Sequence, residues 1–319
     1  MKKTYQWAII GTGDIARQFA GNFQNEESEL YGVTARNFTK VQAFAKEFNV
    51  AHSFRSVDEL LADETIDFVY IAVPNSIHYQ YIMAALKAGK HVLCEKAITM
   101  NQKELTEAVQ LAEEKHLILQ EAMTIFHMPL YKELKKIQES NKLGKLKLIQ
   151  APFGSYKDPN PSNRFFNPDL AGGALLDIGT YAVSFARFFL TETPEVLYSN
   201  VLPFKTGVDE QSITVFRNPA DEMAAVSLAF QAKLPKQGIV AFEKGYITIN
   251  EYPRADQATI TYRDGTNEVI QKGESKDALN YEIQSLIDTV KGAPNTSLIL
   301  TQDVLAILDQ MREWWKKQS

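Results

Sequence analysis

The sequence has few of the residues that hold metal ions or stabilise small secreted proteins. Cys94 is the only cysteine, so the chain cannot form an internal disulfide. The five histidines lack the spacing of metal ligands. No apolar run approaches the roughly twenty residues of a membrane-spanning helix, and the formal charge of −5 gives no positive surplus for nucleic acid. These absences argue against a metal site, a membrane protein and a nucleic-acid-binding protein, and the single cysteine favours the cytoplasm.

What is present is concentrated at the beginning of the chain. An apolar stretch over residues 6–10 leads into a small-residue turn, and a second apolar stretch covers residues 30–35. The turn reads Gly11, Thr12, Gly13, Asp14, Ile15 and Ala16. Gly11 permits a tight turn, and Gly13 lets backbone N–H groups approach a pyrophosphate at the N-terminus of the following helix. The order strand, glycine turn, helix, strand predicts a dinucleotide-binding unit.

Arg36 follows the second apolar stretch, where such a unit meets the adenosine ribose. An acidic residue there accepts a hydrogen bond from a 2′-hydroxyl, whereas an arginine pairs with a 2′-phosphate. Residues 35–40 contain no carboxylate and two cations, Arg36 and Lys40. The segment therefore favours NADP over NAD, although NAD remains an alternative.

Strands and helices alternate over residues 1–123. Residues 67–73 read as a buried parallel strand that includes Ala72 and stops at Pro74 and Asn75. A helical pattern over 79–88 separates it from the next strand, residues 91–94. We predict a dinucleotide-binding domain over 1–123, an α/β fold of the Rossmann type with a doubly wound parallel sheet and its ligand site beyond the strands' carboxyl ends.

The pattern changes over residues 124–319. Extended segments predominate, and helices are predicted only over 174–190, 279–290 and 301–315. We predict a C-terminal α+β domain for substrate binding and oligomerisation, with a large, mostly antiparallel open sheet. An uncovered sheet face carrying Ile213, Val215, Val226 and Phe230 would expose apolar area that a second copy could bury, so we expect a homodimer or higher homo-oligomer.

Two local groups of residues could perform chemistry. In the first, a strand delivers Glu95 and Lys96 to its carboxyl end; the alternative is an ordinary surface pair. In the second, Asp177 and Tyr181 stand four apart on a helix that glycines open, so both could reach one ligand. A carboxylate in this apolar stretch needs a charged or hydrogen-bonding partner, which a structural arginine could also supply.

Four segments occur together in a distinctive order. They are IIGTGDIA (9–16), AVPNSIH (72–78), GKHVLCEK (89–96) and GGALLDIGTY (172–181). This order resembles the glucose-fructose oxidoreductase / inositol dehydrogenase (Gfo/Idh/MocA) family over nearly the whole chain. The resemblance implies a dinucleotide-binding domain, a C-terminal sheet domain used for oligomerisation, and hydride transfer on sugars, polyols or related alcohols.

Two departures from the family pattern bear on the site. The family's Glu-Lys-Pro reads Glu95-Lys96-Ala97 here. A cis bond before alanine costs about 3–4 kcal/mol, so the bond is either trans, with the lysine aimed differently, or strained. Tyr181 stands where the inositol dehydrogenase branch carries histidine. In this it resembles the dihydrodiol and D-xylose dehydrogenase branch, which uses NADP.

The residues and the resemblance together predict a reversible oxidation of a secondary alcohol. Tyr181 would carry the proton, Lys96 would favour its phenolate, and Asp177 would orient substrate hydroxyls. His78 either lies at the nicotinamide end or is a capped loop histidine. Cofactor contacts are expected from Gly11, Thr12, Gly13, Asp14, Ile15, Arg36, Lys40, Ala72, Pro74, Asn75, His78, Glu95 and Lys96.

Substrate contacts are expected from Asp177, Tyr181 and the polar and aromatic loop over 155–166. Lys157 and Arg164 are the candidates in that loop, whose alternative is a plain surface loop. Two rival functions stay open. One is a non-catalytic NADP-binding sensor that acts through the exposed sheet. The other is a reductase of an aromatic or bilin-like substrate, which the aromatic loop permits.

Overall fold

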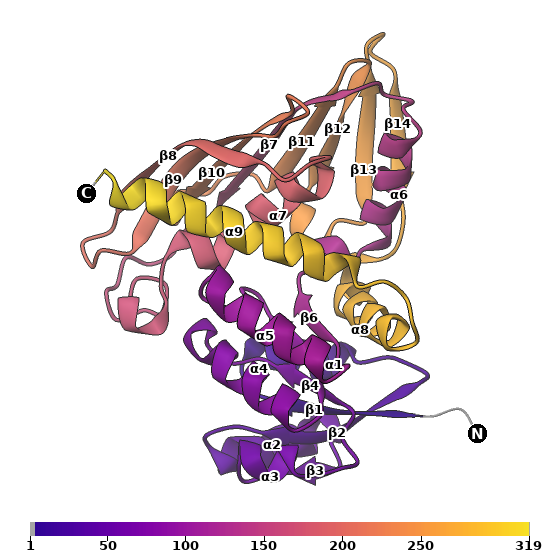
Figure 1. The fold of residues 1–319 in the computed structure, drawn as a ribbon, viewed down its shortest axis with the longest axis vertical. Helices are drawn as coiled ribbons and strands as arrows, with labels where there is room; N and C mark the ends of the chain where they lie inside the picture. Colours follow the sequence, from indigo (N-terminus) through magenta and orange to yellow (C-terminus); the bar gives the residue numbers. More distant parts are fainter. Residues whose placement is uncertain (1–3, 319) are drawn as a thin grey trace. The chain divides into compact units, whose positions relative to one another are not determined.

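The computed structural model describes residues 4–318, and these form two compact units (Figure 1). The first unit runs to Ala122 and takes in Leu279–Leu298. The second comprises Met123–Ala278 and the chain from Ile299 onward. Each unit is built on its own sheet.

The first unit is a doubly wound parallel sheet with the strand order β3-β2-β1-β4-β5-β6. Its strands are β1 (Tyr5–Ile10), β2 (Ser28–Thr34), β3 (His52–Ser53), β4 (Phe68–Ile71), β5 (His91–Glu95) and β6 (Leu119–Ala122). Its helices are α1 (Asp14–Asn22), α2 (Phe38–Phe48), α3 (Val57–Leu61), α4 (His78–Lys87), α5 (Gln102–Glu114) and α8 (Ala278–Val290). All neighbouring strands are parallel, which confirms the predicted Rossmann arrangement.

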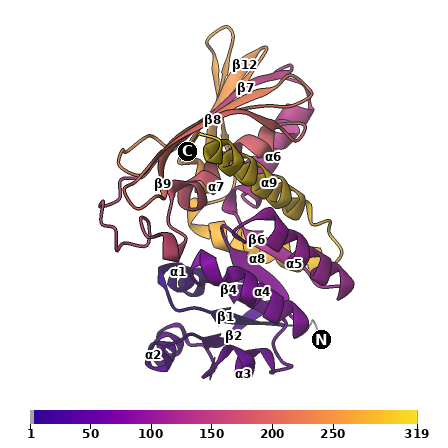
Figure 2. The ribbon, with the colours of Figure 1, turned by 60° about the vertical axis from the view of Figure 1, so that its left-hand side comes forward.

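The hydrophobic core of this unit explains its two helical layers. Side chains of α1, α2 and α8 join those of the central strands in one buried cluster, and α4 and α5 lie on the opposite face (Figure 2). Within the cluster, Trp7 stacks on Phe68 with ring centroids 4.6 Å apart, and Phe19 stacks on Tyr70 at 3.8 Å. Burial of these large rings contributes about 1.5–3 kcal/mol each to folding.

Helix α8 returns to the first unit, whereas the sequence analysis assigned all of 124–319 to the second domain. Its apolar face (Leu279, Ile283, Leu286 and Ile287) is buried in the core of the first unit. Its polar side chains bond the end of α1, since Asn280 donates to the Asn22 carbonyl at 2.8 Å. Helical periodicity shows that α8 has a face to bury, but it does not indicate which sheet receives that face.

The second unit is a mostly antiparallel sheet with the order β14-β13-β12-β11-β7-β10-β9-β8. Only the β10–β7 pair is parallel among the pairings of the described residues. The strands are β7 (Leu146–Gly154), β8 (Glu195–Pro203), β9 (Asp209–Arg217), β10 (Met223–Ala229), β11 (Gln237–Phe242), β12 (Gly245–Asn250), β13 (Gln257–Tyr262) and β14 (Asn267–Gln271). The predicted sheet type is confirmed. The sequence pattern predicts extended segments over 146–150, 211–216, 223–230, 239–242 and 258–262, so strands β8, β12 and β14 are additional.

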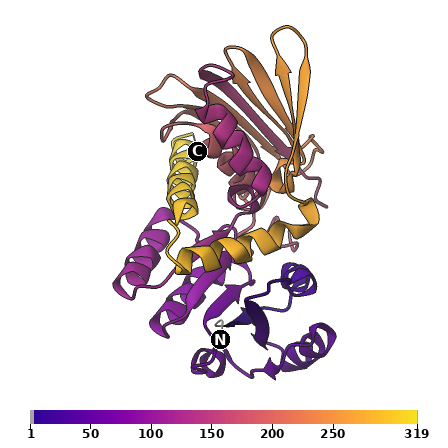
Figure 3. The ribbon, with the colours of Figure 1, turned by 90° about the vertical axis from the view of Figure 1, so that its right-hand side faces the viewer.

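Helices cover one face of this sheet and leave the other open (Figure 3). The covering helices are α6 (Pro129–Glu139), α7 (Thr180–Phe189) and the part of α9 (Thr296–Lys316) that follows Leu298. Exposed side chains on the open face include Leu148, Ile213, Met223 and Tyr246. Leu148 and Met223 are register partners, Tyr246 and Leu148 both pair with Ala241, and Ile213 pairs with Ser227 farther along β10.

Two residues expected on the open face are instead buried. Val226 is opposite Thr214 in the β9–β10 pair, and both side chains point to the helix-covered face. Phe230 lies just beyond β10 and packs against Phe165 and Phe166, with ring centroids 5.7 Å from each. Side chains alternate between the two faces of a strand. Met223 and Ser227 of the same strand point to the open face, so Val226 points to the other face. Ile213 is exposed and Val215 is half-buried, as an open face requires.

Candidate active site

Gly11 occupies the point where the strand order of the parallel sheet reverses, between β1 and β4. Its backbone φ of +127° favours glycine, and a Cβ at this position would overlap the carbonyl oxygen of Ala72 at the end of β4. The Gly11 N–H donates to the Thr34 carbonyl at 2.8 Å. Three strand ends thus fix this turn, and ligands of open α/β sheets bind at such a reversal.

The N-terminus of α1 follows directly. Gly13 is the residue before the first helical turn, no side chain caps that turn, and a Cβ on Gly13 would meet no atom within 4 Å. Thr12 and Ile15 are half-buried, while Asp14 is exposed. Open space and uncapped N–H groups at a helix N-terminus suit the pyrophosphate of a dinucleotide. The residues present therefore fit such a cofactor.

Arg36 and Lys40 are both exposed beyond the end of β2. The side chain of Asn37, between them, accepts the Lys40 backbone N–H at 3.1 Å and caps α2. Within residues 4–318, the Arg36 guanidinium forms no hydrogen bond or ion pair. The cation is therefore available to an anionic group.

His78 is completely buried at the start of α4. Its Nδ1 lies 2.8 Å from the Ala97 carbonyl oxygen and its Nε2 lies 2.8 Å from the Val73 carbonyl oxygen. Burial lowers the pKa of His78, while these backbone contacts act in the opposite direction. Of the two alternatives for His78, a nicotinamide contact or a capped loop histidine, this geometry matches the capped loop histidine. The ring ties the loop after β4, where Pro74 and Asn75 lie, to the segment after Lys96.

Lys96 follows β5 and is half-buried, and the Lys96–Ala97 peptide bond is cis. The preceding Glu95 points into the unit. Its carboxylate accepts the Tyr70 hydroxyl at 2.6 Å and the Lys96 backbone N–H at 3.3 Å. Burial and the nearby Glu95 charge raise the pKa of Tyr70 well above its ordinary value. These contacts give Glu95 a role in fixing the end of β5, beside the predicted cofactor role.

In the second unit, Asp177 lies in a π-helical turn, Leu175–Gly179, that continues into α7. The predicted α-helix over 174–190 thus begins with a π turn, a feature found frequently at functional sites. The Asp177 carboxylate lies 4.0 Å from the Lys157 ammonium, and each side chain is 21% exposed. Tyr181 is half-buried in the first turn of α7, with its ring 6.1 Å from that of Phe153.

The loop before this turn is anchored rather than loose. The Lys157 backbone N–H donates to the Phe230 carbonyl at 2.7 Å, and Thr206 donates to the Phe166 carbonyl at 2.6 Å. The Lys157 ammonium and the Arg164 guanidinium lie 4.2 and 4.3 Å from the ring centre of Phe165. One aromatic ring therefore holds both predicted substrate cations in place.

Asp209, at the start of β9, contacts this segment, although no motif in the sequence singles it out. Its Oδ2 accepts the Leu175 N–H at 2.6 Å, at the start of the π turn. Burial raises the pKa of Asp209 to about 7, against the opposing effects of backbone N–H groups and the Arg312 guanidinium. An isolated acid in a strand pattern carries no local signal of such a contact.

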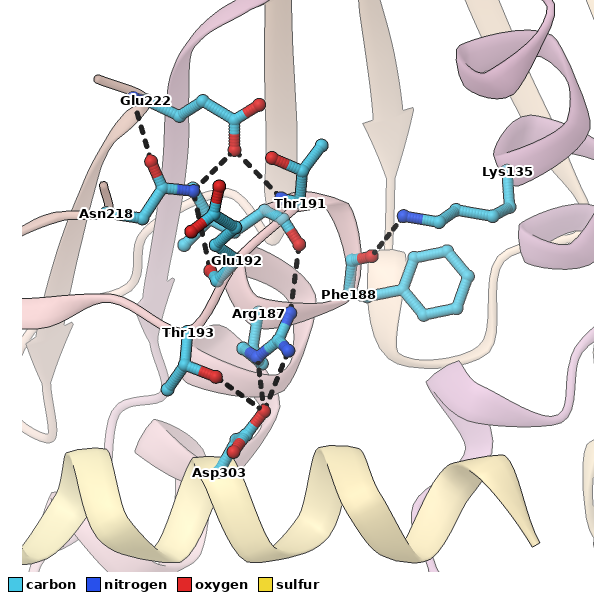
Figure 4. Close-up of polar contacts among 10 residues, drawn as sticks. Lys135, Arg187, Phe188, Thr191, Glu192, Thr193, Asn218, Glu222 and Asp303 are labelled. Atoms are coloured by element: carbon cyan, nitrogen blue, oxygen red, sulfur yellow. Dashed lines mark hydrogen bonds and ion pairs between the residues drawn. The ribbon is translucent and has the colours of Figure 1, made fainter. Parts of the chain in front are cut away.

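The far end of α7 is held by a second set of polar contacts (Figure 4). Arg187 donates to Asp303 of α9, with Nε and Nη2 at 2.8 and 2.7 Å from the same carboxylate oxygen, and to the Leu190 carbonyl at 2.9 Å. Glu222 accepts the Thr191 N–H at 2.8 Å just beyond the helix. The segment carrying Asp177 and Tyr181 is thus fixed in place at both ends.

The parallel sheet, the glycine turn and the uncapped helix define a dinucleotide-binding domain of the Rossmann type. A model of the oxidoreductase family with an NAD-binding Rossmann fold matches residues 5–123, and a GFO/IDH/MocA C-terminal domain model matches residues 131–248. The chain belongs to the Gfo/Idh/MocA family. The matching model describes its N-terminal domain as an NAD-binding Rossmann fold, so its cofactor is a nicotinamide dinucleotide.

Individual proteins resemble most of the chain. The scyllo-inositol 2-dehydrogenase (NADP(+)) IolU of Bacillus subtilis is 30% identical over 90% of this chain and 88% of its own length. The trans-1,2-dihydrobenzene-1,2-diol dehydrogenase of Xenopus laevis is 29% identical, with 97% of each chain covered. A levoglucosan dehydrogenase, solved with NADH and levoglucosan, matches the fold with a TM-score of 0.88 at 20% identity, covering 99% of this chain and 98% of that one.

Across residues 4–318, no group of three or more His, Cys, Asp or Glu side chains could hold a metal ion. Over the same residues, no helix combines the length and the apolar character needed to cross a membrane.

Proposed function

We propose that this protein is an NADP-preferring dehydrogenase that oxidises a secondary alcohol of a sugar, a polyol or a cyclic diol, and reduces the corresponding ketone. The observation that carries the proposal is the pairing of Asp177 and Tyr181 on one anchored π-to-α segment in a member of this family. The named relatives act on an inositol and a dihydrodiol, which supports the alcohol substrate.

The nicotinamide ring, when bound, supplies the hydride acceptor for oxidation and the donor for reduction. Tyr181 Oη takes the proton of the substrate hydroxyl in oxidation and returns it in reduction. A phenol has an ordinary pKa of about 10, so this role needs a neighbouring positive charge, and Lys96 is our candidate. Asp177, with Lys157 4.0 Å away, accepts hydrogen bonds from other substrate hydroxyls and so orients the sugar or diol.

We propose that one region of the chain binds the cofactor and the other binds the substrate. We assign the cofactor to residues 1–123, with Gly11, Thr12, Gly13, Asp14 and Ile15 at the pyrophosphate. Further cofactor contacts are proposed for Ala72, Pro74, Asn75, Glu95 and Lys96, with His78 supporting their loops. We assign substrate binding to the second unit, with Lys157 and Arg164 joining Asp177 and Tyr181.

Replacement of Arg36 by alanine tests the cofactor preference. If Arg36 pairs with the 2′-phosphate, its loss removes a charged hydrogen bond of about 1.5–3 kcal/mol. We expect the Kd for NADPH to rise about 10- to 100-fold and the Kd for NADH to change less than about twofold. Fluorescence titration of both nucleotides measures this.

Lys46→Ala removes an exposed cation from the last turn of α2 and serves as the control. Both Kd values should stay at the wild-type level in that variant. Equal weakening of NADPH and NADH in Arg36→Ala would contradict a role in reading the 2′-phosphate.

A substrate screen tests the proposed function itself. Purified protein with NADP is mixed with scyllo-inositol, D-xylose, levoglucosan or an aromatic trans-dihydrodiol, and nicotinamide absorbance is followed. Turnover of at least one alcohol is expected. Tight NADPH binding without turnover of any alcohol or ketone would favour the sensor. Reduction by NADPH of an aromatic or bilin-like substrate, with no turnover of any of these four alcohols, would favour the second rival, which the Phe153 and Phe165 rings beside the predicted substrate residues allow.

We further propose that the open face of the eight-stranded sheet joins two copies of the chain. Leu148, Ile213, Met223 and Tyr246 are between 39% and 59% exposed on this face. Apolar side chains clustered on one sheet face gain stability when a second copy removes them from water.

Ile213→Asp should therefore lower the mass in light scattering from that of a dimer, or of a higher oligomer, toward one chain. Ile299 of α9 is equally exposed, at 60% against 59% for Ile213, but lies away from the sheet's open face. Ile299→Asp should keep the wild-type mass. An unchanged mass in Ile213→Asp would refute assembly through this face.

We also propose a cytoplasmic location. Its support is Cys94, the single cysteine, whose thiol is buried and free. Burial raises the pKa of that thiol well above its ordinary value, so it stays protonated and unreactive.

A further inference from the structure

The start of the π turn needs an acceptor from elsewhere in the chain. The first N–H groups of a helix have no partner within it, and the residue preceding this turn, Ala174, has no side chain that can cap it. Asp209 supplies the acceptor from 34 residues away, through the Leu175 N–H at 2.6 Å. The contact therefore links β9 to the segment that carries Asp177 and Tyr181.

Placing the Asp209 carboxylate here requires a glycine at position 173 and disfavours ionisation of the acid. Gly173 has a φ of +124°, and a Cβ there would overlap the Oδ1 atom of Asp209. Burial disfavours the ionised carboxyl, as its raised pKa shows. Two kinds of group favour its ionised form. One is the Arg312 guanidinium of α9, which donates to Asp309 at 3.0 Å, and the other is the backbone N–H groups of Ala174 and Leu175. A half-buried acid that is costly to ionise, and that a glycine makes room for beside a predicted catalytic segment, suggests more than a packing role.

The π turn gives this contact a geometric consequence. π turns are rare, and α-helix is the common alternative for the same residues. Each helical residue advances about 100° around the axis, so relaxation of the turn to α geometry would rotate Asp177 relative to Tyr181. Arg187 and Asp303 hold only the opposite end of α7 and cannot prevent this (Figure 4).

We propose that Asp209 is a positioning residue for the alcohol-oxidising reaction. By accepting the Leu175 N–H, it holds the π turn in the geometry that presents Asp177 and Tyr181 to the substrate. This inference rests on the proposed function, and it adds to that function a residue that touches neither substrate nor cofactor.

The test compares Asp209→Ala with Asp209→Asn, whose amide oxygen still accepts the Leu175 N–H. For Asp209→Ala we expect kcat on the alcohol found in the screen to fall about 10- to 100-fold, with the NADPH Kd within about twofold of wild type. Asp209→Asn should recover most of kcat. Hydrogen exchange of the peptide covering 173–183, read by mass spectrometry, should accelerate in Asp209→Ala and stay near wild type in Asp209→Asn.

Asp303→Asn is the matched control, because it removes an acid that anchors the other end of α7. It should lower the melting temperature without slowing the folded enzyme or exposing the amides over 173–183. The proposal is overturned if Asp209→Ala keeps wild-type kcat, if Asp209→Asn is as slow as Asp209→Ala, or if Asp303→Asn slows turnover equally. If wild type oxidises no alcohol, the proposed function fails, and unchanged exchange in Asp209→Ala would then separately overturn the positioning role.

Gly173→Ala gives a second route to the same result, since its methyl group would displace the carboxylate without removing it. We expect Gly173→Ala to lower kcat as much as Asp209→Ala does, and the double variant to show no further loss. Gly207→Ala controls for backbone strain, because Gly207 also has a positive φ, +90°, but no atom near its Cβ position. Equal slowing by Gly207→Ala, or full additivity of the two losses, would contradict the mechanism.

Discussion

Replacing Tyr181 by phenylalanine is expected to lower kcat by about 10²- to 10⁴-fold while leaving the NADPH Kd unchanged. The change removes only the hydroxyl that we assign to proton transfer, and a positioned proton donor contributes an effect of that size. The ring remains, so its contact with Phe153 and the start of α7 are preserved. Steady-state kinetics with NADP and the best alcohol, alongside NADPH fluorescence titration, measures both quantities.

The matched control is Tyr262→Phe, in strand β13 of the same unit. Tyr262 also loses a hydroxyl that makes a hydrogen bond, in its case to Glu268 on the protein surface. The kcat of Tyr262→Phe should equal that of wild type. The pH profile adds a further check, because the limb that reports the phenol's ionisation should disappear only in Tyr181→Phe. Full turnover by that variant would remove Tyr181 from the catalytic role.

Replacing Gly13 by valine is expected to raise the Kd for both NADPH and NADH about 100-fold or more, equivalent to about 2.7 kcal/mol. A Cβ at Gly13 meets no protein atom within 4 Å, and the backbone there is extended, which valine tolerates. The fold should therefore survive. The added bulk instead occupies the space in which we place the pyrophosphate. Nucleotide titration and thermal unfolding separate the two effects.

Substitutions at two other glycines serve as comparisons for Gly13→Val. Gly21→Ala, later in the same helix, places its Cβ 3.4 Å from Phe48 and should leave nucleotide binding intact. Gly11→Ala forces a side chain onto the Ala72 carbonyl and should destabilise the fold itself. If Gly13→Val binds NADPH as wild type does, the dinucleotide does not occupy this turn.

Local sequence patterns determined the parts of the molecule that depend on local geometry. The glycine turn, the alternating strands and helices, and the buried run 67–73 each have a period or a residue type that only one backbone conformation satisfies. For the same reason the parallel sheet and the mostly antiparallel sheet were both predicted. The candidate residues Lys96, Asp177 and Tyr181 were found by their motifs, and their catalytic roles stay predictions.

Other features were decided only by contacts between distant residues. Asp209 caps a turn 34 positions earlier, α8 completes the core of the first unit, and strand register turns Val226 inward. His78 and Glu95 were predicted to contact the cofactor, and those contacts stay predictions. Only the folded chain shows that their side chains also bond Ala97, Val73 and Tyr70. A periodic pattern shows which face of an element is apolar, but the partner of that face, or of one polar atom, is fixed only when the chain has folded.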